Sequence, residues 1–313
     1  MKYKETCIRK KCPVCLSLQF KEIYKLPYAS KELKKYLLNF YNITLNEINH
    51  LKYSNYILCE CYNCKSLFQK EIPNNFLMMR IYEKWISSKS LIKIKKNLSI
   101  EYYKHHAEEI AQIVCCFFFK PPSQLNFLDF GMGWGAWAML AKSYGINSYG
   151  LELSKERALH AARNGISVIN KKSTLSKKFD FINTEQVFEH IANPYETLKY
   201  LKSGLKRKGI IKISVPFAYA CNRRLKLMDW NSAKGSFNSL NFIAPLEHIN
   251  YYKRSSIIKM GEKLGFQEVK IPILKQYLNS QIIGDKKFTA YIKYLTRPIY
   301  KNIFSNYVFL QTK

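Results

Sequence analysis

The chain of 313 residues lacks the long apolar run that marks a membrane-spanning segment. Its longest such run, residues 110–119, is well below the roughly 20 residues needed to cross a bilayer. No apolar segment follows the basic start, so the sequence predicts that there is no signal peptide. Both absences predict a soluble, cytoplasmic protein. Acidic residues are also scarce, because 22 Asp and Glu against 51 Lys and Arg leave a formal net charge of +29.

The excess of positive charge has two interpretations. Lysine outnumbers arginine several-fold and is spread over many segments, which is typical of lysine-rich coding and of solvated surfaces. A basic domain is also the electrostatic footprint of a nucleic-acid binder. The charge therefore predicts attraction to anionic partners in general, including nucleotide sugars, phospholipid surfaces and RNA, without choosing among them.

Paired cysteines indicate a separate N-terminal module. C-P-V-C at residues 12–15 and C-Y-N-C at residues 61–64 are two C-x-x-C turns, and each can supply two thiolates to one zinc ion. A disulfide framework is disfavoured in the cytosol, and the βαβ context of a redox pair is missing. Cys7 and Cys59 are alternative ligands. We predict a structural zinc site, with a helix near residues 30–40 between its two halves, formed by Cys12, Cys15, Cys61 and Cys64.

A glycine-rich turn is the most informative motif. Residues 126–130 read as a short buried strand, and residues 136–141 read as the start of a helix. Between them lie Gly131, Gly133 and Gly135, which let the backbone turn tightly and approach a ligand closely. The N-terminus of the helix adds unpaired N–H groups, so this segment predicts a nucleotide-type binding site.

The neighbouring carboxylates indicate which ligand binds. Gly131, Gly133 and Ala136 also fit the dinucleotide fingerprint. A second predicted strand ends in Glu152, which can accept hydrogen bonds from ribose hydroxyls in either kind of site. Asp129 separates the two readings, because a carboxylate there is unfavourable beside a pyrophosphate but suits the cationic sulfonium and ammonium of S-adenosyl-L-methionine (SAM).

Later motifs agree with SAM. F-D-F-I-N at residues 179–183, E-H at 189–190 and V-P at 215–216 follow in order. Over residues 101–266 the chain resembles class I SAM-dependent methyltransferases. The resemblance implies an α/β fold, a Rossmann-like sheet of seven strands. Its later strands are expected at residues 149–153, 167–170, 179–183, 210–215, 266–274 and, antiparallel, 306–311.

The resemblance also implies roles for individual residues. Asp129 and the glycine turn would hold the methionine end of SAM, and Glu152 would hold the ribose. Thr174 would lie near adenine, and Glu185 would border the methionine moiety and the acceptor. The full set of predicted SAM-binding residues is Asp129, Phe130, Gly131, Gly133, Gly135, Glu152, Leu153, Thr174, Thr184 and Glu185.

A zinc module followed by a SAM domain resembles a bacterial group of methyltransferases, many of them linked to surface polysaccharide or nucleotide-sugar pathways. Its sugar C-methyltransferases carry a late Glu-His pair, which here is Glu247-His248 after Pro245-Leu246, where those enzymes have Tyr and His. A histidine can remove a proton near neutral pH. We predict His248, Glu247 and His190 as catalytic residues. The alternatives are that His248 only binds a backbone carbonyl and that Glu189 and His190 only hold a loop.

Together these patterns predict a SAM-dependent methyltransferase that contains structural Zn²⁺ and acts on a small anionic acceptor. The expected acceptor is a sugar or nucleotide-sugar of surface polysaccharide biosynthesis. An RNA methyltransferase and a non-catalytic SAM-binding scaffold are the alternatives. The predicted segments are a zinc module with a linker helix over residues 1–90, a SAM-binding core over 91–275, and a helical cap with the final strand over 276–313.

Overall fold

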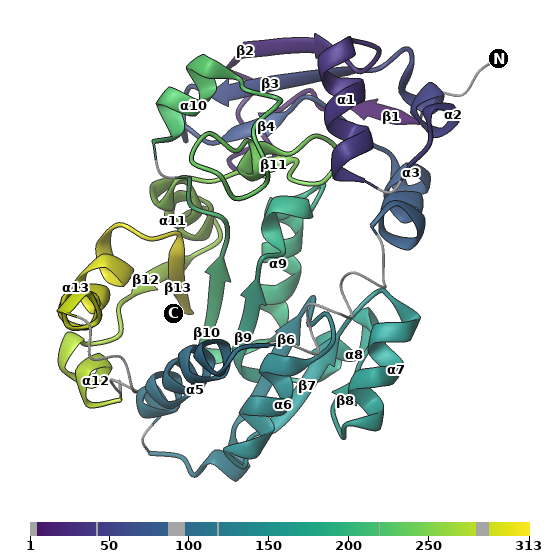
Figure 1. Ribbon diagram of the computed structural model, residues 1–313. Coiled ribbons are helices and arrows are strands. Elements are labelled where there is room, and N and C mark those ends of the chain that lie inside the picture. The colour runs from purple at the N-terminus through teal and green to yellow at the C-terminus, as the bar shows by residue number, and fades with distance from the viewer. Residues whose placement is uncertain (1–4, 42, 87–97, 118, 219, 280–287) are drawn as a thin grey trace. The chain divides into compact units, whose positions relative to one another are not determined.

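The computed structural model describes residues 5–41, 43–86, 98–117, 119–218, 220–279 and 288–313. They form two compact units (Figure 1). The first contains the described residues within 1–97, 188–195 and 216–256, and the second contains those within 98–187, 196–215 and 257–313. The predicted boundary at residues 90–91 lies outside the described residues.

The first unit is built on small antiparallel sheets. One sheet has the strand order β11-β4-β3-β2, and a two-stranded sheet pairs β1 with β5. The strands are β1 (Thr6–Ile8), β2 (Phe20–Pro27), β3 (Asn55–Cys61), β4 (Leu67–Gln69), β5 (Glu71–Pro73) and β11 (Asn250–Tyr251). The helices are α1 (Lys31–Phe40), α2 (Leu45–Ile48), α3 (Asn75–Arg80), a π-helical turn (Ile81–Trp85) and α10 (Cys221–Leu227).

Helix α1 confirms the helix predicted between the cysteine pairs. The side chain of Ser30 caps it by accepting a hydrogen bond from the backbone N–H of Leu33. Leu33, Tyr36 and Leu37 are buried, and this i, i+3, i+4 spacing places them on one face of the helix.

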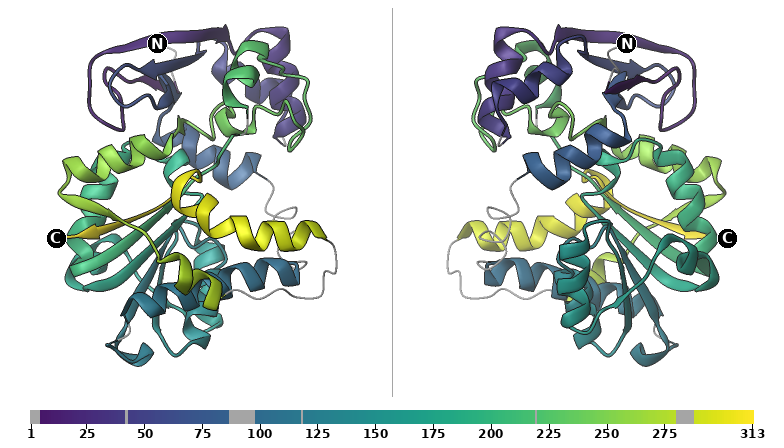
Figure 2. Two further views of the ribbon diagram at one scale, coloured as in Figure 1. Left: turned by 90° about the vertical axis from the view of Figure 1, so that its left-hand side faces the viewer. Right: turned by 90° about the vertical axis from the view of Figure 1, so that its right-hand side faces the viewer.

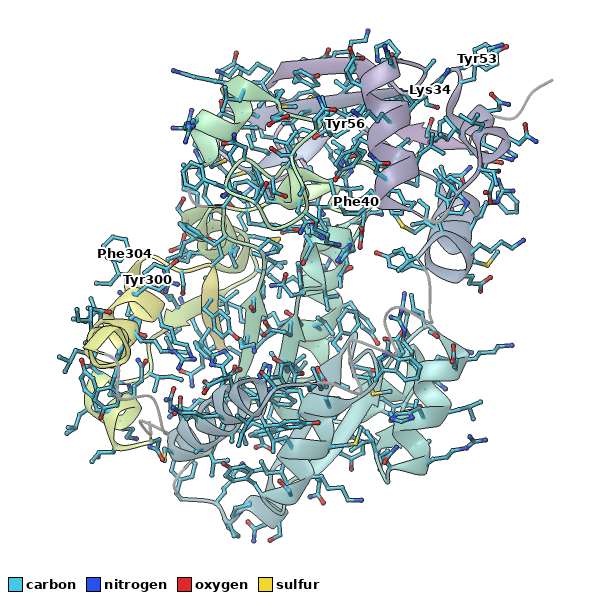
Figure 3. The ribbon with its side chains drawn as sticks, in the orientation of Figure 1. Lys34, Phe40, Tyr53, Tyr56, Tyr300 and Phe304 are labelled. Carbon is cyan, nitrogen blue, oxygen red and sulfur yellow. The ribbon has the colours of Figure 1, made fainter. Side chains whose placement is uncertain are left out.

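Aromatic packing explains why residues 216–256 belong with the N-terminal strands. The ring of Trp230 packs edge-on against that of Tyr56, with centroids 5.3 Å apart. The Tyr56 hydroxyl donates to the Ile243 carbonyl at 3.0 Å, and Trp230 Nε1 donates to the Tyr24 hydroxyl at 2.9 Å. Tyr56 comes from β3 and Phe40 from the end of α1, and both are labelled in Figure 3. Buried aromatic groups from distant segments thus form one core.

The second unit contains a seven-stranded sheet with the order β12-β13-β10-β9-β6-β7-β8. β13 runs antiparallel to both of its neighbours, and the other pairings are parallel. This confirms the predicted fold class and the antiparallel last strand. The strands are β6 (Asn126–Phe130), β7 (Asn147–Leu151), β8 (Ser167–Val168), β9 (Phe179–Glu185), β10 (Leu205–Ser214), β12 (Phe266–Val269) and β13 (Tyr307–Thr312).

Helices lie on both sides of this sheet in the views of Figure 2. Ile110 of α5 and Trp137 of α6 pack with Phe127 and Phe181 of the sheet in one apolar cluster. The helices are α5 (Ile100–Val114), α6 (Ala136–Ser143), α7 (Lys155–Arg163), α8 (Lys171–Ser176), α9 (Pro194–Gly204), α11 (Arg254–Lys263), α12 (Ile273–Leu278) and α13 (Phe288–Ile303). No helix in the described ranges has the length and apolarity needed to cross a bilayer.

Two local predictions need correction. The strand predicted over residues 266–274 ends at Val269, because Pro272 lacks the N–H that a ladder needs and instead precedes helix α12. The strand predicted over residues 167–170 likewise ends at Val168, and the basic segment that follows is largely helix α8. The side chain of Asn170 caps that helix by accepting from the N–H of Ser173 at 2.9 Å.

Candidate active site

The glycine turn joins β6 to α6 in a conformation that favours glycine. Gly131, Gly133 and Gly135 have φ angles of +74°, +55° and +84°. A Cβ on Gly131 would lie 2.7 Å from Cγ2 of Val187, whereas a Cβ on Gly133 would have nothing within 4 Å. The turn therefore needs glycine for its backbone, and it leaves open space at Gly133 where a ligand can approach.

Asp129 is a buried carboxylate at the end of β6. Its side chain is 3% exposed, and Oδ1 accepts a hydrogen bond from Nδ2 of Asn183 at 2.8 Å. Burial raises the pKa of Asp129 to about 7, while the hydrogen bond from Asn183 opposes this shift. A cationic group bound beside Asp129 would favour its ionised form.

Glu152 lies directly after β7 and is held by the turn itself. Its Oε2 accepts from the N–H of Gly133 at 2.9 Å, and its Oε1 accepts from the N–H of Ser154 at 2.9 Å. Each carboxylate oxygen has a further lone pair. Glu152 is therefore oriented and can still accept hydrogen bonds from the hydroxyls of a ligand.

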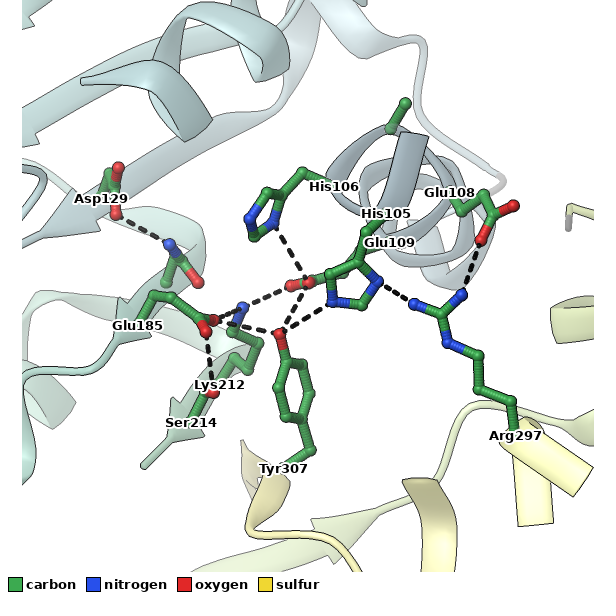
Figure 4. Close-up of polar contacts among 12 residues, drawn as sticks. His105, His106, Glu108, Glu109, Asp129, Glu185, Lys212, Ser214, Arg297 and Tyr307 are labelled. Carbon is green, nitrogen blue, oxygen red and sulfur yellow. Dashed lines mark hydrogen bonds and ion pairs between the residues drawn. The ribbon is translucent and has the colours of Figure 1, made fainter. Parts of the chain in front are cut away.

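A charged network lies at the same edge of the sheet (Figure 4). Nζ of the fully buried Lys212, on β10, is 2.5 Å from Oε1 of Glu109 and 2.6 Å from Oε2 of Glu185. Ser214 Oγ and the Tyr307 hydroxyl donate to Glu185 at 3.0 and 3.1 Å. Glu185 thus has three donors, yet its side chain is 30% exposed and can contact a ligand.

Lys212 and Glu109 were missed in the sequence prediction. Burial favours the neutral forms of both groups, but their mutual attraction raises the pKa of Lys212 and lowers that of Glu109. The available signal was a lysine inside the otherwise apolar strand 210–213. A lysine there needs a buried acidic partner, and that partner comes from a distant helix.

The other predicted SAM-binding residues are placed as follows. Phe130 is buried at the end of β6, and Leu153, after β7, is 84% exposed. The hydroxyl of Thr174 donates to the carbonyl of Asn170 at 3.0 Å, and that of Thr184 donates to the carbonyl of Lys212 at 2.7 Å. Their roles toward SAM stay predictions.

The four predicted cysteine ligands meet in the first unit. Cys12 and Cys64 have sulfur atoms 3.7 Å apart, and those of Cys15 and Cys61 are 3.5 Å apart. Zinc–sulfur bonds of about 2.3 Å place the sulfurs of a tetrahedral site about 3.8 Å apart. Among the described residues, Cys59 and the exposed Cys7 lie outside this cluster.

The two cysteine turns share one backbone geometry. Leu16 and Lys65, which follow the second cysteine of each turn, both have positive φ angles of 64° and 59°. Each donates its N–H to the carbonyl of the first cysteine, at 2.9 Å to Cys12 and 3.1 Å to Cys61. Two equivalent turns facing one another are what a tetrahedral metal site with two ligands from each turn requires.

The predicted catalytic histidines lie together in the first unit. The rings of His190 and His248 have centroids 4.8 Å apart. His190 Nδ1 donates to the Glu247 carbonyl at 3.0 Å, and His248 Nδ1 donates to the Asn241 carbonyl. Burial lowers the pKa of His190 to about 3 and that of His248 to about 4. Both are therefore neutral near pH 7.

The carboxylate of Glu247 is directed at a tyrosine. Its Oε2 lies 3.5 Å from the hydroxyl of Tyr41, which also donates to the Pro245 carbonyl at 2.8 Å. Burial raises the pKa of Glu247 above its ordinary value. A catalytic role for these three residues stays a prediction.

The sheet order and the turn define a class of protein. β6 has β7 on one side and β9 on the other, so the glycine turn lies where the order of the sheet reverses. Open α/β sheets bind ligands at that point, at the carboxyl ends of the strands. A glycine turn between two carboxylates in a sheet with one antiparallel strand is the arrangement that the resemblance to SAM-dependent methyltransferases predicts.

The comparison with protein families agrees. A family model described as a methyltransferase domain matches residues 102–271, which is more than half of the chain. The chain belongs to this methyltransferase-domain family. The comparison with curated proteins found no match.

Several solved structures are similar. The plantazolicin methyltransferase BpumL, in complex with a triazolic desmethylPZN analogue and SAH, is 16% identical, with a TM-score of 0.46 over 76% of this chain and 95% of that chain. The magnesium protoporphyrin IX methyltransferase ChlM from Synechocystis PCC 6803, with bound SAH, is 14% identical, with a TM-score of 0.46 over 76% and 100%. A SAM-dependent methyltransferase from Archaeoglobus fulgidus is 17% identical, with a TM-score of 0.40 over 72% and 100%.

Proposed function

We propose that SAM binds at the β6–α6 turn with its charged methionine end toward Asp129 and its ribose toward Glu152. The buried carboxyl of Asp129 has a pKa near neutrality, so a sulfonium or ammonium group nearby stabilises its ionised form. The open space at Gly133 lets the ligand approach the backbone. Glu152, already fixed by two N–H groups, has lone pairs for the ribose hydroxyls.

We further propose that the acceptor is a small anionic molecule, a sugar or nucleotide-sugar of surface polysaccharide biosynthesis. The observation that carries this proposal is the half-buried carboxylate of Glu185, which Lys212, Ser214 and Tyr307 hold at the strand ends in the same unit as Asp129. A fixed carboxylate there suits an acceptor that offers hydroxyl donors. The formal charge of +29 favours an acceptor that is also anionic.

In this proposal the protein contributes alignment more than covalent chemistry. Methyl transfer is an in-line displacement at the methyl carbon attached to sulfur, so the donor and acceptor atoms must be held in line. Asp129 and Glu152 orient the donor, and Glu185 orients an acceptor hydroxyl. A hydroxyl acceptor must also lose its proton to a base.

For the first unit we propose a structural zinc ion bound by Cys12, Cys15, Cys61 and Cys64. The sulfur–sulfur distances are close to those of a tetrahedral zinc site, and all four cysteines are buried. Binding of zinc by such a set is worth on the order of 10 kcal/mol, which a small module can use as folding energy.

The acceptor class is tested by supplying SAM with a labelled methyl group to the enzyme in an extract of the source cells. The products are then separated into small anionic metabolites, protein and nuclease-sensitive polymer. Label among the small metabolites supports the proposal, and a panel of nucleoside-diphosphate sugars then identifies the acceptor. Label that ribonuclease releases would instead establish an RNA acceptor. The same extract supplied with the Asp129→Asn variant is the control, because it measures the label that other enzymes in the extract transfer.

A further inference from the structure

A second group of potential metal ligands lies in the first unit, apart from the cysteines. Glu189, His190 and His248 each present one ligand atom, and these atoms lie within 4.8 Å of one another. Two imidazoles and one carboxylate are the donor set of many catalytic zinc and non-haem iron sites. We propose that this cluster binds a divalent transition-metal cation. The inference goes beyond the proposed function, because cation binding requires neither SAM nor an acceptor.

The protonation of both rings suits metal binding. His190 Nδ1 is hydrogen-bonded to the carbonyl of Glu247, and His248 Nδ1 is hydrogen-bonded to the carbonyl of Asn241. A carbonyl only accepts hydrogen bonds, so each Nδ1 carries the proton and each Nε2 keeps its lone pair. Metal-binding histidines are commonly oriented in this way by a second hydrogen bond to a carbonyl or carboxylate.

The backbone that carries Glu189 and His190 is held by several long-range hydrogen bonds. Asn250 Nδ2 donates to the carbonyls of Phe188 and Ile191 at 3.0 and 2.8 Å. The Tyr252 hydroxyl also donates to the Phe188 carbonyl at 3.0 Å, and Arg9 Nη2 donates to the carbonyl of Ala192 at 2.7 Å. The carbonyls on both sides of the two ligands are thus fixed, and a fixed backbone keeps its side chains in place for a ligand.

The ligand atoms, which lie within 4.8 Å of one another, would have to draw closer around a cation. Zinc–nitrogen bonds of about 2.0 Å place the ligand atoms of a tetrahedral site about 3.3 Å apart. His190 Nε2 and Glu189 Oε1 are already 3.8 Å apart. Glu189 is 1% exposed, so a cation would also neutralise a deeply buried carboxylate.

Another trio with the right chemistry, His105, His106 and Glu109 in the second unit, is a poorer site. Its carboxylate already binds the ammonium of Lys212 at 2.5 Å, and the guanidinium of Arg297 contacts His105 Nδ1. A cation there would meet two positive charges. Lys234 acts on both His190 and His248, but in each case it is the last of the effects on the pKa of the ring.

Three protein ligands leave at least one coordination position open. A water molecule in that position would lose its proton more readily. In this arrangement His190 and His248 are metal ligands and not free bases. The two roles can be told apart: a histidine that acts as a base does so without added metal, whereas a metal ligand acts only when the cation is bound.

The experiment uses full-length protein whose cysteine cluster is loaded with zinc and which has been dialysed against a chelator too weak to remove that zinc. Cobalt(II) is then titrated and followed by absorption and calorimetry. We expect one equivalent to bind with cobalt d–d bands and without the thiolate-to-cobalt charge-transfer band. Glu189→Gln and His248→Gln should each weaken this binding at least about 100-fold, since even outer-shell changes cost 10- to 100-fold.

The matched control is His50→Gln, which removes a histidine of the same unit that lies outside all three clusters and should leave cobalt binding unchanged. Circular dichroism checks that each variant is folded. Wild-type protein that binds no cobalt under these conditions overturns the proposal without any variant. Equal affinity in wild type, Glu189→Gln and His248→Gln overturns it as well. Neither result bears on SAM binding, so the proposed function is tested separately.

Discussion

Asp129 and Asn183 are register partners on the adjacent parallel strands β6 and β9, and the Asn183 side chain donates to the Asp129 carboxylate at 2.8 Å. This pair combines a buried acid with one neutral donor at the edge of the sheet where the glycine turn lies. The arrangement leaves the carboxylate without full compensation for its burial, which raises its pKa to about 7. A cationic ligand supplies that compensation.

The raised pKa of Asp129 has a consequence for stability. The folded protein keeps this carboxyl protonated at pH values where the unfolded chain has lost the proton. Its contribution to stability is therefore present at low pH and is lost as the pH rises from about 4 to about 7. The free energy of unfolding of ligand-free Asp129→Asn should lack this component, which urea titrations between pH 5 and pH 8 will measure. Identical pH profiles for the two proteins would contradict the assignment.

Asp129→Asn should also weaken SAM binding about 10- to 100-fold, the cost of losing a hydrogen bond or contact to a charged group. The loss should be smaller at pH 6, where the wild-type carboxyl is itself largely protonated. Calorimetric titration at pH 6 and pH 8 measures both effects. Unchanged affinity at pH 8 would show that SAM does not bind beside Asp129.

Replacing Lys212 with Met should destabilise the second unit by about 3–5 kcal/mol, because Glu109 and Glu185 lose their buried counter-ion. Chemical denaturation measures the change. The double variant Lys212→Met with Glu109→Gln should recover part of the loss, since it removes one of the two unpaired charges. A single-variant cost below about 1 kcal/mol would argue that the network is solvated.

Cys61→Ser should lower the zinc content by one equivalent and destabilise the first unit. The matched control is Cys59→Ser, a buried cysteine of the same strand that lies outside the cysteine cluster. Metal analysis of both purified variants measures zinc per chain. Equal zinc content in Cys61→Ser and wild type would disprove the ligand assignment.

Lys208→Gly should stabilise the protein by up to about 1 kcal/mol, because Lys208 has a φ angle of +59°, which costs energy for any residue with a Cβ. Arg207→Gly is the control, since Arg207 is equally exposed but does not have a positive φ angle, and glycine there should destabilise. Thermal unfolding compares the two variants.

Much of the second unit could be predicted from the sequence because its signals are local. The glycine turn, the strand before it and Glu152 lie within some 30 residues, and short-range backbone preferences decide their conformation. The cysteine turns are also local, since the spacing within each pair sets the geometry of its two ligands. The end of strand β12 was misplaced although Pro272, inside the predicted range, is itself a local signal against a strand.

Only the tertiary structure decided which distant segments meet. Residues 216–256 join the N-terminal strands because the rings of Tyr56 and Trp230 share one core. Lys212 pairs with Glu109, which lies on a helix far from its strand in the sequence. The ring of His190 packs against that of His248, which comes from a distant segment of the chain. Sequence patterns report periodicity and turns, whereas these pairings depend on how buried surfaces fit together over long distances.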